Sequence, residues 1–228
     1  MGTDNLFQKN KNKAAEAHKR SKAKQAPYER VLIVCEGKKT EPFYLAGLRK
    51  TLGLNHANVV IDDKKCGLDP KSLVEYALEK FKKDSDFNHI FCVFDRDKHL
   101  TYATALDKIR AKRLKGGTII HPITSIPCFE VWILLHFTYF SAPFQAATNE
   151  SNCALVVREL RKKGRIPGYD KGDKEVFNIV MDNLDDAITN AKKLERHHDG
   201  IGTDNPSTKV YKLVEHLQCL KLQYQQDP

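Results

Sequence analysis

The feature that most constrains this chain is an apolar run, residues 89–94, that ends in two carboxylates within Asp95-Arg96-Asp97. The run is short and rich in aromatic and β-branched residues, which is typical of a strand buried in a parallel sheet. Ligands of open α/β sheets bind at the carboxyl ends of the strands, where these acids would lie. Two acids one residue apart can direct oxygens to one hard cation. The alternative is a solvated loop in which Asp97 only caps the next helix.

A second buried-strand pattern, residues 31–35, also ends on an acid, Glu36, which Gly37 follows. A glycine at this position lets the backbone approach a phosphate closely, and the next two residues, Lys38 and Lys39, are able to bind one. The stretch lacks the glycine and lysine spacing of a P-loop. It therefore predicts a strand, an acidic loop and then a helix.

Strand and helix patterns alternate through the first part of the chain. Further strands are expected at residues 59–61 and 118–120, and the first helix begins at Thr40-Glu41-Pro42. This alternation predicts an α/β fold: a Rossmann-like, mostly parallel central sheet with helices on both faces. We divide the chain into a basic arm at residues 1–27 and a domain at 28–228. The domain comprises an α/β core at 28–145 and a helical C-terminal part at 146–228.

Glu130 is the unusual residue of an otherwise apolar segment. Pro127 precedes it near a helix start, and Phe129, Val131 and Trp132 surround it. One interpretation is favourable placement of an acid at the helix N-terminus. The other is a site role, because a carboxylate among apolar neighbours needs a metal or a basic group as its partner.

Net charge and composition limit the classes of partner that suit this chain. The 228-residue chain carries a formal charge of +9, which points toward a polyanion such as nucleic acid. The basic arm either steers nucleic acid or only improves solubility, and Lys162, Lys163 and Arg165 form a second basic cluster. We expect no membrane span and no secretory signal. Six scattered cysteines favour unpaired, buried thiols in a reducing cytoplasm.

The strand-end acids define the expected chemistry. Glu36, Asp95 and Asp97 are hard oxygen donors at neighbouring strand ends, and the cations Lys38, Lys39 and Arg96 flank them. This set suits Mg²⁺ or Mn²⁺ held by a few carboxylates, waters and a substrate phosphate. The implied reaction is phosphoryl or phosphodiester chemistry.

Several motifs carry a family resemblance. Residues 31–41 together with Phe94-Asp95-Arg96-Asp97 resemble the Toprim fold of topoisomerases, primases and OLD-type nucleases. More narrowly, Pro127-Cys128-Phe129-Glu130 with the residues at 132 and 134–137, followed by Asn205-Pro206-Ser207-Thr208, is similar to the RloB-like family. The similarity runs from about residue 30 to residue 217.

The resemblance implies roles for particular residues. Glu36 would be the Toprim glutamate, a metal ligand or general acid/base, and Asp95 and Asp97 the metal-binding pair. We add Glu130 as a catalytic candidate. Gly37, Glu41, Ser207 and Thr208 are supporting candidates, and the last two are expected to begin the final helix.

Three functions are compatible with this sequence. The first is a metal-dependent endonuclease acting on DNA or RNA, with tRNA among the candidate substrates. RloB-like proteins are associated with restriction and phage-defence loci beside an ATPase, which implies a nuclease under partner control. The second is a nucleic-acid-binding or regulatory subunit that does not cut. The third is a phosphotransferase or phosphatase acting on a small anion. The oligomeric state is left open.

Overall fold

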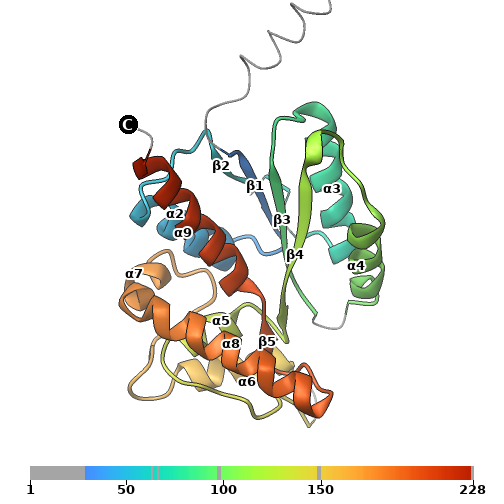
Figure 1. Ribbon diagram of the computed structural model, residues 1–228. Coiled ribbons are helices and arrows are strands. Elements are labelled where there is room, and N and C mark those ends of the chain that lie inside the picture. Colours follow the sequence, from blue (N-terminus) through green and yellow to red (C-terminus); the bar gives the residue numbers. More distant parts are fainter. Residues whose placement is uncertain (1–28, 63, 66, 97–98, 148–149, 227–228) are drawn as a thin grey trace, which may run out of the picture.

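The computed structural model describes residues 29–62, 64–65, 67–96, 99–147 and 150–226 (Figure 1). Within them, the fold centres on one five-stranded sheet with the order β2-β1-β3-β4-β5. The strands are β1 (Val31–Cys35), β2 (Val59–Asp62), β3 (His89–Asp95), β4 (Ile119–Ile126) and β5 (Ser207–Thr208). The first four strands run parallel, and β5 is antiparallel to β4. The predicted mostly parallel α/β fold is confirmed. The basic arm lies outside the described residues.

Helices cover both faces of the sheet (Figure 1). The helices of the described chain are α2 (Thr40–Thr51), α3 (Pro70–Lys83), α4 (Tyr102–Ala111), α5 (Glu130–Leu135), α6 (Asn152–Leu160), α7 (Val176–Val180), α8 (Leu184–Ile201) and α9 (Val210–Gln226), with short 3-10 turns at Lys115–Gly117 and Met181–Asn183. Helices α3 and α4 pack on one face, and α2 with the helices after β4 packs on the other.

Successive strand residues alternate between two buried cores. On β1, Val31, Ile33 and Cys35 belong to the core shared with α2 and α5, whereas Leu32 and Val34 belong to the core shared with α3 and α4. This follows from the strand period of two, which points neighbouring side chains to opposite faces. Burial on both faces explains why the strand is apolar at every position.

Helix α3 shows how local sequence starts an element. The Asp69 carboxylate accepts hydrogen bonds from the backbone N–H groups of Lys71 at 3.1 Å and Ser72 at 3.4 Å. Pro70 occupies the first helical position, where a missing N–H costs nothing. Thr101, just before α4, donates its hydroxyl to the same carboxylate at 2.7 Å, so the cap also connects two helices.

The last part of the chain differs from the sequence prediction. The final helix begins at Val210 rather than at Asn205, because Ser207 and Thr208 form β5 beside the end of β4. The Asn205 side chain instead exchanges hydrogen bonds with the backbone of Phe144. Strand β4 is also longer than predicted. Residues 121–126 mix polar side chains and a proline with two isoleucines, which obscured the apolar signal, and they gain ladder partners from β3 and β5.

A disulfide joins Cys128, just before α5, to Cys153 in α6. The expectation of six unpaired thiols is therefore wrong for these two. Their 25-residue separation is bridged only when α6 packs on α5, which the spacing does not reveal. None of the described helices is long and apolar enough to cross a bilayer.

Candidate metal-binding pocket at the strand ends

Glu36 and Asp95 meet at the carboxyl ends of two adjacent strands. Strands β1 and β3 pair directly, and Glu36 follows β1 while Asp95 is the last residue of β3. The backbone N–H of Asp95 donates to Oε2 of Glu36 at 3.0 Å. The other oxygen, Oε1, lies 2.9 Å from Nε2 of His99. The structure thus brings together two of the three acids expected there. Asp97 lies outside the described residues.

Gly37 makes room for a further glutamate, Glu41, in the first turn of α2. A Cβ atom at residue 37 would lie 1.9 Å from Oε2 of Glu41, so the Glu41 carboxylate would have to move. The Glu41 side chain is buried, with 6% of the residue exposed. The glycine therefore serves here to let a carboxylate approach the turn after β1.

Glu130 joins the same group from α5. It is only 2% exposed, and Tyr169 donates its hydroxyl to Oε1 at 3.2 Å. The ammonium group of Lys171 lies 3.3 Å from Oε2 of Glu130. Sγ of the disulfide-bonded Cys153 lies at the same distance, 3.3 Å, from that oxygen. Glu130 thus has the basic partner that burial among apolar residues requires.

These side chains surround one pocket of about 300 Å³. The lining residues are Glu36, Gly37, Lys38, Lys39, Thr40, Glu41, Asp95, Glu130, Lys171 and Gly172. The loop after α6 closes one side, where the backbone N–H of Gly172 donates to Oγ1 of Thr40 at 3.0 Å. Gly172 has a φ of +84°, which favours glycine. The pocket therefore combines four carboxylates with three lysines.

Crowding of carboxylates changes their protonation. Burial, together with the charges of Glu130 and Glu36, raises the pKa of Glu41 to about 7. Burial and the charges of Glu41, Glu130 and Glu36 raise the pKa of Asp95 well above its usual range. Both shifts reflect burial first, and then repulsion between the neighbouring carboxylates. A cation in the pocket would relieve this repulsion and displace protons.

The remaining cationic candidates lie elsewhere. Arg96, which directly follows β3, forms an ion pair with Asp204. Lys162 and Arg165 both pair with Glu159 at the end of α6, at 2.6 and 2.9 Å. Lys162, Arg165 and the exposed Lys163 do not line the pocket.

Ser207 and Thr208 serve the sheet. The hydroxyls of Thr208 and Ser125 lie 3.0 Å apart between β5 and β4, and the Thr208 hydroxyl also accepts from the backbone N–H of Val210 at 3.2 Å. These contacts hold the start of α9 on the edge of the sheet.

Sequence reasoning missed the loop that carries Tyr169 and Lys171. The segment Gly168-Tyr169-Asp170-Lys171-Gly172 places an aromatic and a cation between two glycines in a polar stretch. That local pattern could have suggested a ligand loop, although only the fold shows that it faces Glu130. His99 was also missed, and nothing in the sequence connects it to Glu36.

The fold and the pocket define an α/β protein whose parallel strands end at an acidic, lysine-flanked cavity. The chain belongs to the RloB-like protein family, whose family model matches residues 31–217. All ten residues that line the pocket fall within that match. No curated protein and no solved structure matches the chain.

Proposed function

We propose that the chain is a divalent-metal-dependent nuclease that hydrolyses phosphodiester bonds in DNA or RNA. The observation that carries the proposal is the convergence of Glu36, Glu41, Asp95 and Glu130 on one pocket flanked by lysines. The four acids come from four separate elements of the fold. Acidic oxygens beside phosphate-binding cations are the groups that metal-assisted phosphodiester hydrolysis requires.

The donor set of the pocket fits Mg²⁺ or Mn²⁺. The carboxylates offer oxygen ligands, which these ions prefer. Burial, and then the nearby carboxylates of Glu41, Glu130 and Glu36, raise the pKa of Asp95, and a divalent ion would relieve that repulsion. Glu36 and Asp95 would hold the ion, with Glu130 and Glu41 next to it. A bound divalent ion would neutralise phosphate charge and lower the pKa of a bound water.

The protein's own residues would do the remaining work. The pKa of Glu41, about 7, suits a group that accepts or donates a proton near neutral pH. The exposed Lys38 and Lys39 would bind a phosphate at the mouth of the pocket. Lys171 would orient Glu130 and reduce the charge repulsion around it.

The cellular setting is proposed from the family resemblance. RloB-like proteins associate with restriction and phage-defence loci beside an ATPase, so we place this nuclease in anti-phage defence in the cytoplasm, under the control of an ATPase partner.

The test is cleavage by the purified full chain of plasmid, single-stranded DNA and total tRNA, with Mn²⁺ or with EDTA. We expect Mn²⁺-dependent cleavage that Asp95→Asn abolishes. The matched control is Asp107→Asn on α4, because the Asp107 side chain is 74% exposed and does not line the pocket. Binding of metal and nucleic acid without any cleavage would instead support a regulatory subunit. Turnover of free nucleotides alone would support a phosphotransferase.

A further inference from the structure

Three histidines and a glutamate gather at the other end of the sheet from the acidic pocket. His89 is the first residue of β3, His121 lies in β4, His216 lies in α9, and Glu29 precedes β1. The ring centroids of His89 and His216 are 4.5 Å apart, and those of His89 and His121 are 5.2 Å apart. Candidate ligand atoms of Glu29, His89 and His216 all lie within 4.8 Å of one another.

Ring nitrogens of His89 and His216 lie beside the carboxylate of Glu29. Nδ1 of His89 lies 2.9 Å from Nε2 of His121. When His89 donates in this bond as a neutral ring, its own Nε2 is unprotonated and lies 3.7 Å from Oε2 of Glu29. Nε2 of His216 is also 3.7 Å from that oxygen, is buried, and has no hydrogen-bond partner.

The contacts between the two imidazole nitrogens and the Glu29 carboxylate are too long for direct hydrogen bonds. Nε2 of His89 and Nε2 of His216 each lie 3.7 Å from Oε2 of Glu29, whereas N–H···O hydrogen bonds span about 2.7–3.2 Å. A histidine ligates a metal through a neutral ring nitrogen.

These distances suit a metal ion between the groups. Ligand atoms about 2.0–2.1 Å from a tetrahedral zinc ion lie roughly 3.3 Å from each other, and the two imidazole nitrogens are each 3.7 Å from Oε2 of Glu29. Two histidines and one glutamate are an established zinc ligand set that leaves a fourth position for water. Imidazole ligands select zinc over magnesium, which distinguishes this cluster from the carboxylate pocket.

The cluster also has an outer hydrogen-bond partner. Histidine ligands usually donate their second ring N–H to another group, which fixes the ring orientation. His121 is placed to accept that bond from His89, and it stacks on Phe91 with the rings 15° from parallel. The orientation of His89 is therefore fixed by its neighbours.

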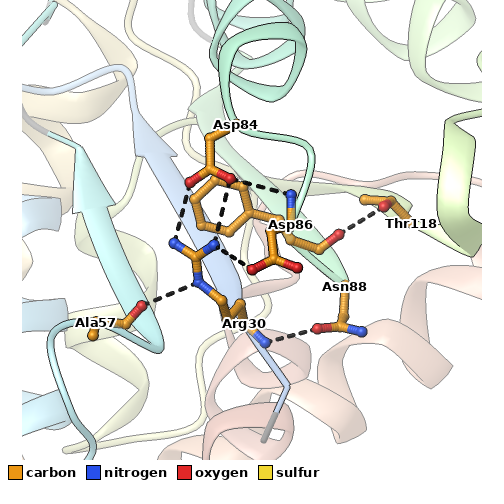
Figure 2. A network of polar contacts seen from close by, with 7 residues as sticks. Arg30, Ala57, Asp84, Asp86, Asn88 and Thr118 are labelled. Carbon is orange, nitrogen blue, oxygen red and sulfur yellow. Dashed lines mark hydrogen bonds and ion pairs between the residues drawn. The ribbon is translucent and has the colours of Figure 1, made fainter. Parts of the chain in front are cut away.

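The backbone around the cluster is held in place. Figure 2 shows the Arg30 guanidinium, one residue after Glu29, between the carboxylates of Asp84 and Asp86. The backbone N–H of Arg30 donates to Oδ1 of Asn88 at 2.8 Å. Because Asn88 precedes His89, this network fixes the spacing of two of the candidate ligands, as a preorganised site requires.

We propose that Glu29, His89 and His216 bind one Zn²⁺ ion at the amino-terminal edge of the sheet, with His121 orienting His89. The ligands come from the segment before β1, from β3 and from α9, so the ion ties the last helix to the strand edge. Tyr224 of α9 supports the same junction by donating its hydroxyl to the carbonyl of Glu29 at 3.1 Å. The proposal does not depend on nuclease activity.

The experiment uses the untagged full chain, stripped with EDTA and kept in excess Mg²⁺ so that the acidic pocket is occupied. We expect one equivalent of Zn²⁺ to bind and to raise the melting temperature. Co²⁺ should give the strong visible absorption of a tetrahedral site. His216→Gln should weaken Zn²⁺ binding at least about 100-fold, since even an outer-shell partner is worth roughly 10–100-fold.

Matched variants separate this site from others. His197→Gln, at an exposed histidine of α8, and Asp95→Asn in the acidic pocket should retain Zn²⁺ binding. If His216→Gln fails to fold, Glu29→Gln replaces it, because the Glu29 side chain is 37% exposed. The proposal is overturned if the parent chain binds no Zn²⁺. It is equally overturned if the cluster variants bind Zn²⁺ as the parent does, or if Asp95→Asn is the change that removes it.

Discussion

The backbone N–H of Asp95, the last residue of β3, donates a hydrogen bond of 3.0 Å to the carboxylate of Glu36, the residue after β1. The bond holds Glu36 against the strand ends and leaves its second oxygen beside His99. Glu36 is therefore positioned by a backbone N–H group, whereas Glu41 lies buried beside Gly37 and Glu130 is held by Tyr169 and Lys171. This difference decides what substitution of each acid should do.

Glu36→Gln should abolish activity and preserve the fold. The amide retains an oxygen that can accept from Asp95, so melting should change little. Loss of the charge removes a metal ligand or proton acceptor, and proton transfer alone is typically worth roughly 10²–10⁴ in rate. Nuclease assays and thermal melts of the two chains check both statements. Near-parental cleavage would remove Glu36 from the site, and failure to fold would assign it a structural role.

Gly37→Ala should weaken metal binding although residue 37 donates no ligand. The new Cβ would meet the Glu41 carboxylate at 1.9 Å and force it out of position. We expect Mn²⁺ affinity to fall by about 10–100-fold, the usual effect of disturbing groups around a metal. Gly168→Ala is the control, because its Cβ would meet nothing within 4 Å. Equal affinities for the two variants would contradict this account.

Asp95→Asn should remove Mn²⁺ binding and stabilise the metal-free chain. Its pKa is raised by burial and by three neighbouring acids, so the neutral amide replaces a group that disfavours ionisation. Titration calorimetry measures the affinity, and thermal unfolding in EDTA measures the stability. Unchanged Mn²⁺ affinity would show that the ion does not bind at Asp95.

Glu41 should make the metal-free chain less stable as the pH rises. Its pKa is 4.5 in a model peptide and about 7 in the fold, so the folded state binds the proton more tightly. The resulting stability is complete below pH 4.5 and is lost as the pH rises through 7. The loss amounts to about 3 kcal/mol at most.

Comparison with Glu41→Gln isolates this contribution, since the amide does not titrate. Relative to that variant, the parent chain should lose stability between pH 5 and pH 8 in urea unfolding. Glu79→Gln, at an exposed position of α3, should show no such pH-dependent difference. If the difference in unfolding free energy between the parent chain and Glu41→Gln stays constant across this range, the raised pKa of Glu41 is refuted.

Replacing Lys38 and Lys39 together with alanine should weaken nucleic-acid binding in a salt-dependent way. Each lost phosphate contact lowers the slope of log affinity against log salt by about 1, so the pair should lower it by about 2. The control replaces Lys82 and Lys83, another adjacent exposed pair, at the end of α3. Fluorescence anisotropy across a salt series measures the slopes. Identical slopes for both double variants would exclude the pocket lysines from binding.

The amino-acid sequence determined the sheet and half of the pocket. Two apolar runs must be buried on both faces, and alternating helices require those strands to be parallel. Parallel neighbours end at the same edge, so Glu36 and Asp95 had to approach each other. This inference needs only local patterns and one topological rule.

The tertiary structure decided the rest of the pocket and the placement of β5. Thr40 receives a hydrogen bond from a loop 132 residues away, and Glu130 receives one from Tyr169, 39 residues away. Likewise, β5 is strand only because β4 lies beside it. Contacts of this kind depend on how helices pack, which varies with side-chain volume across the whole core. No local periodicity carries that information, because the partners share no segment of the chain.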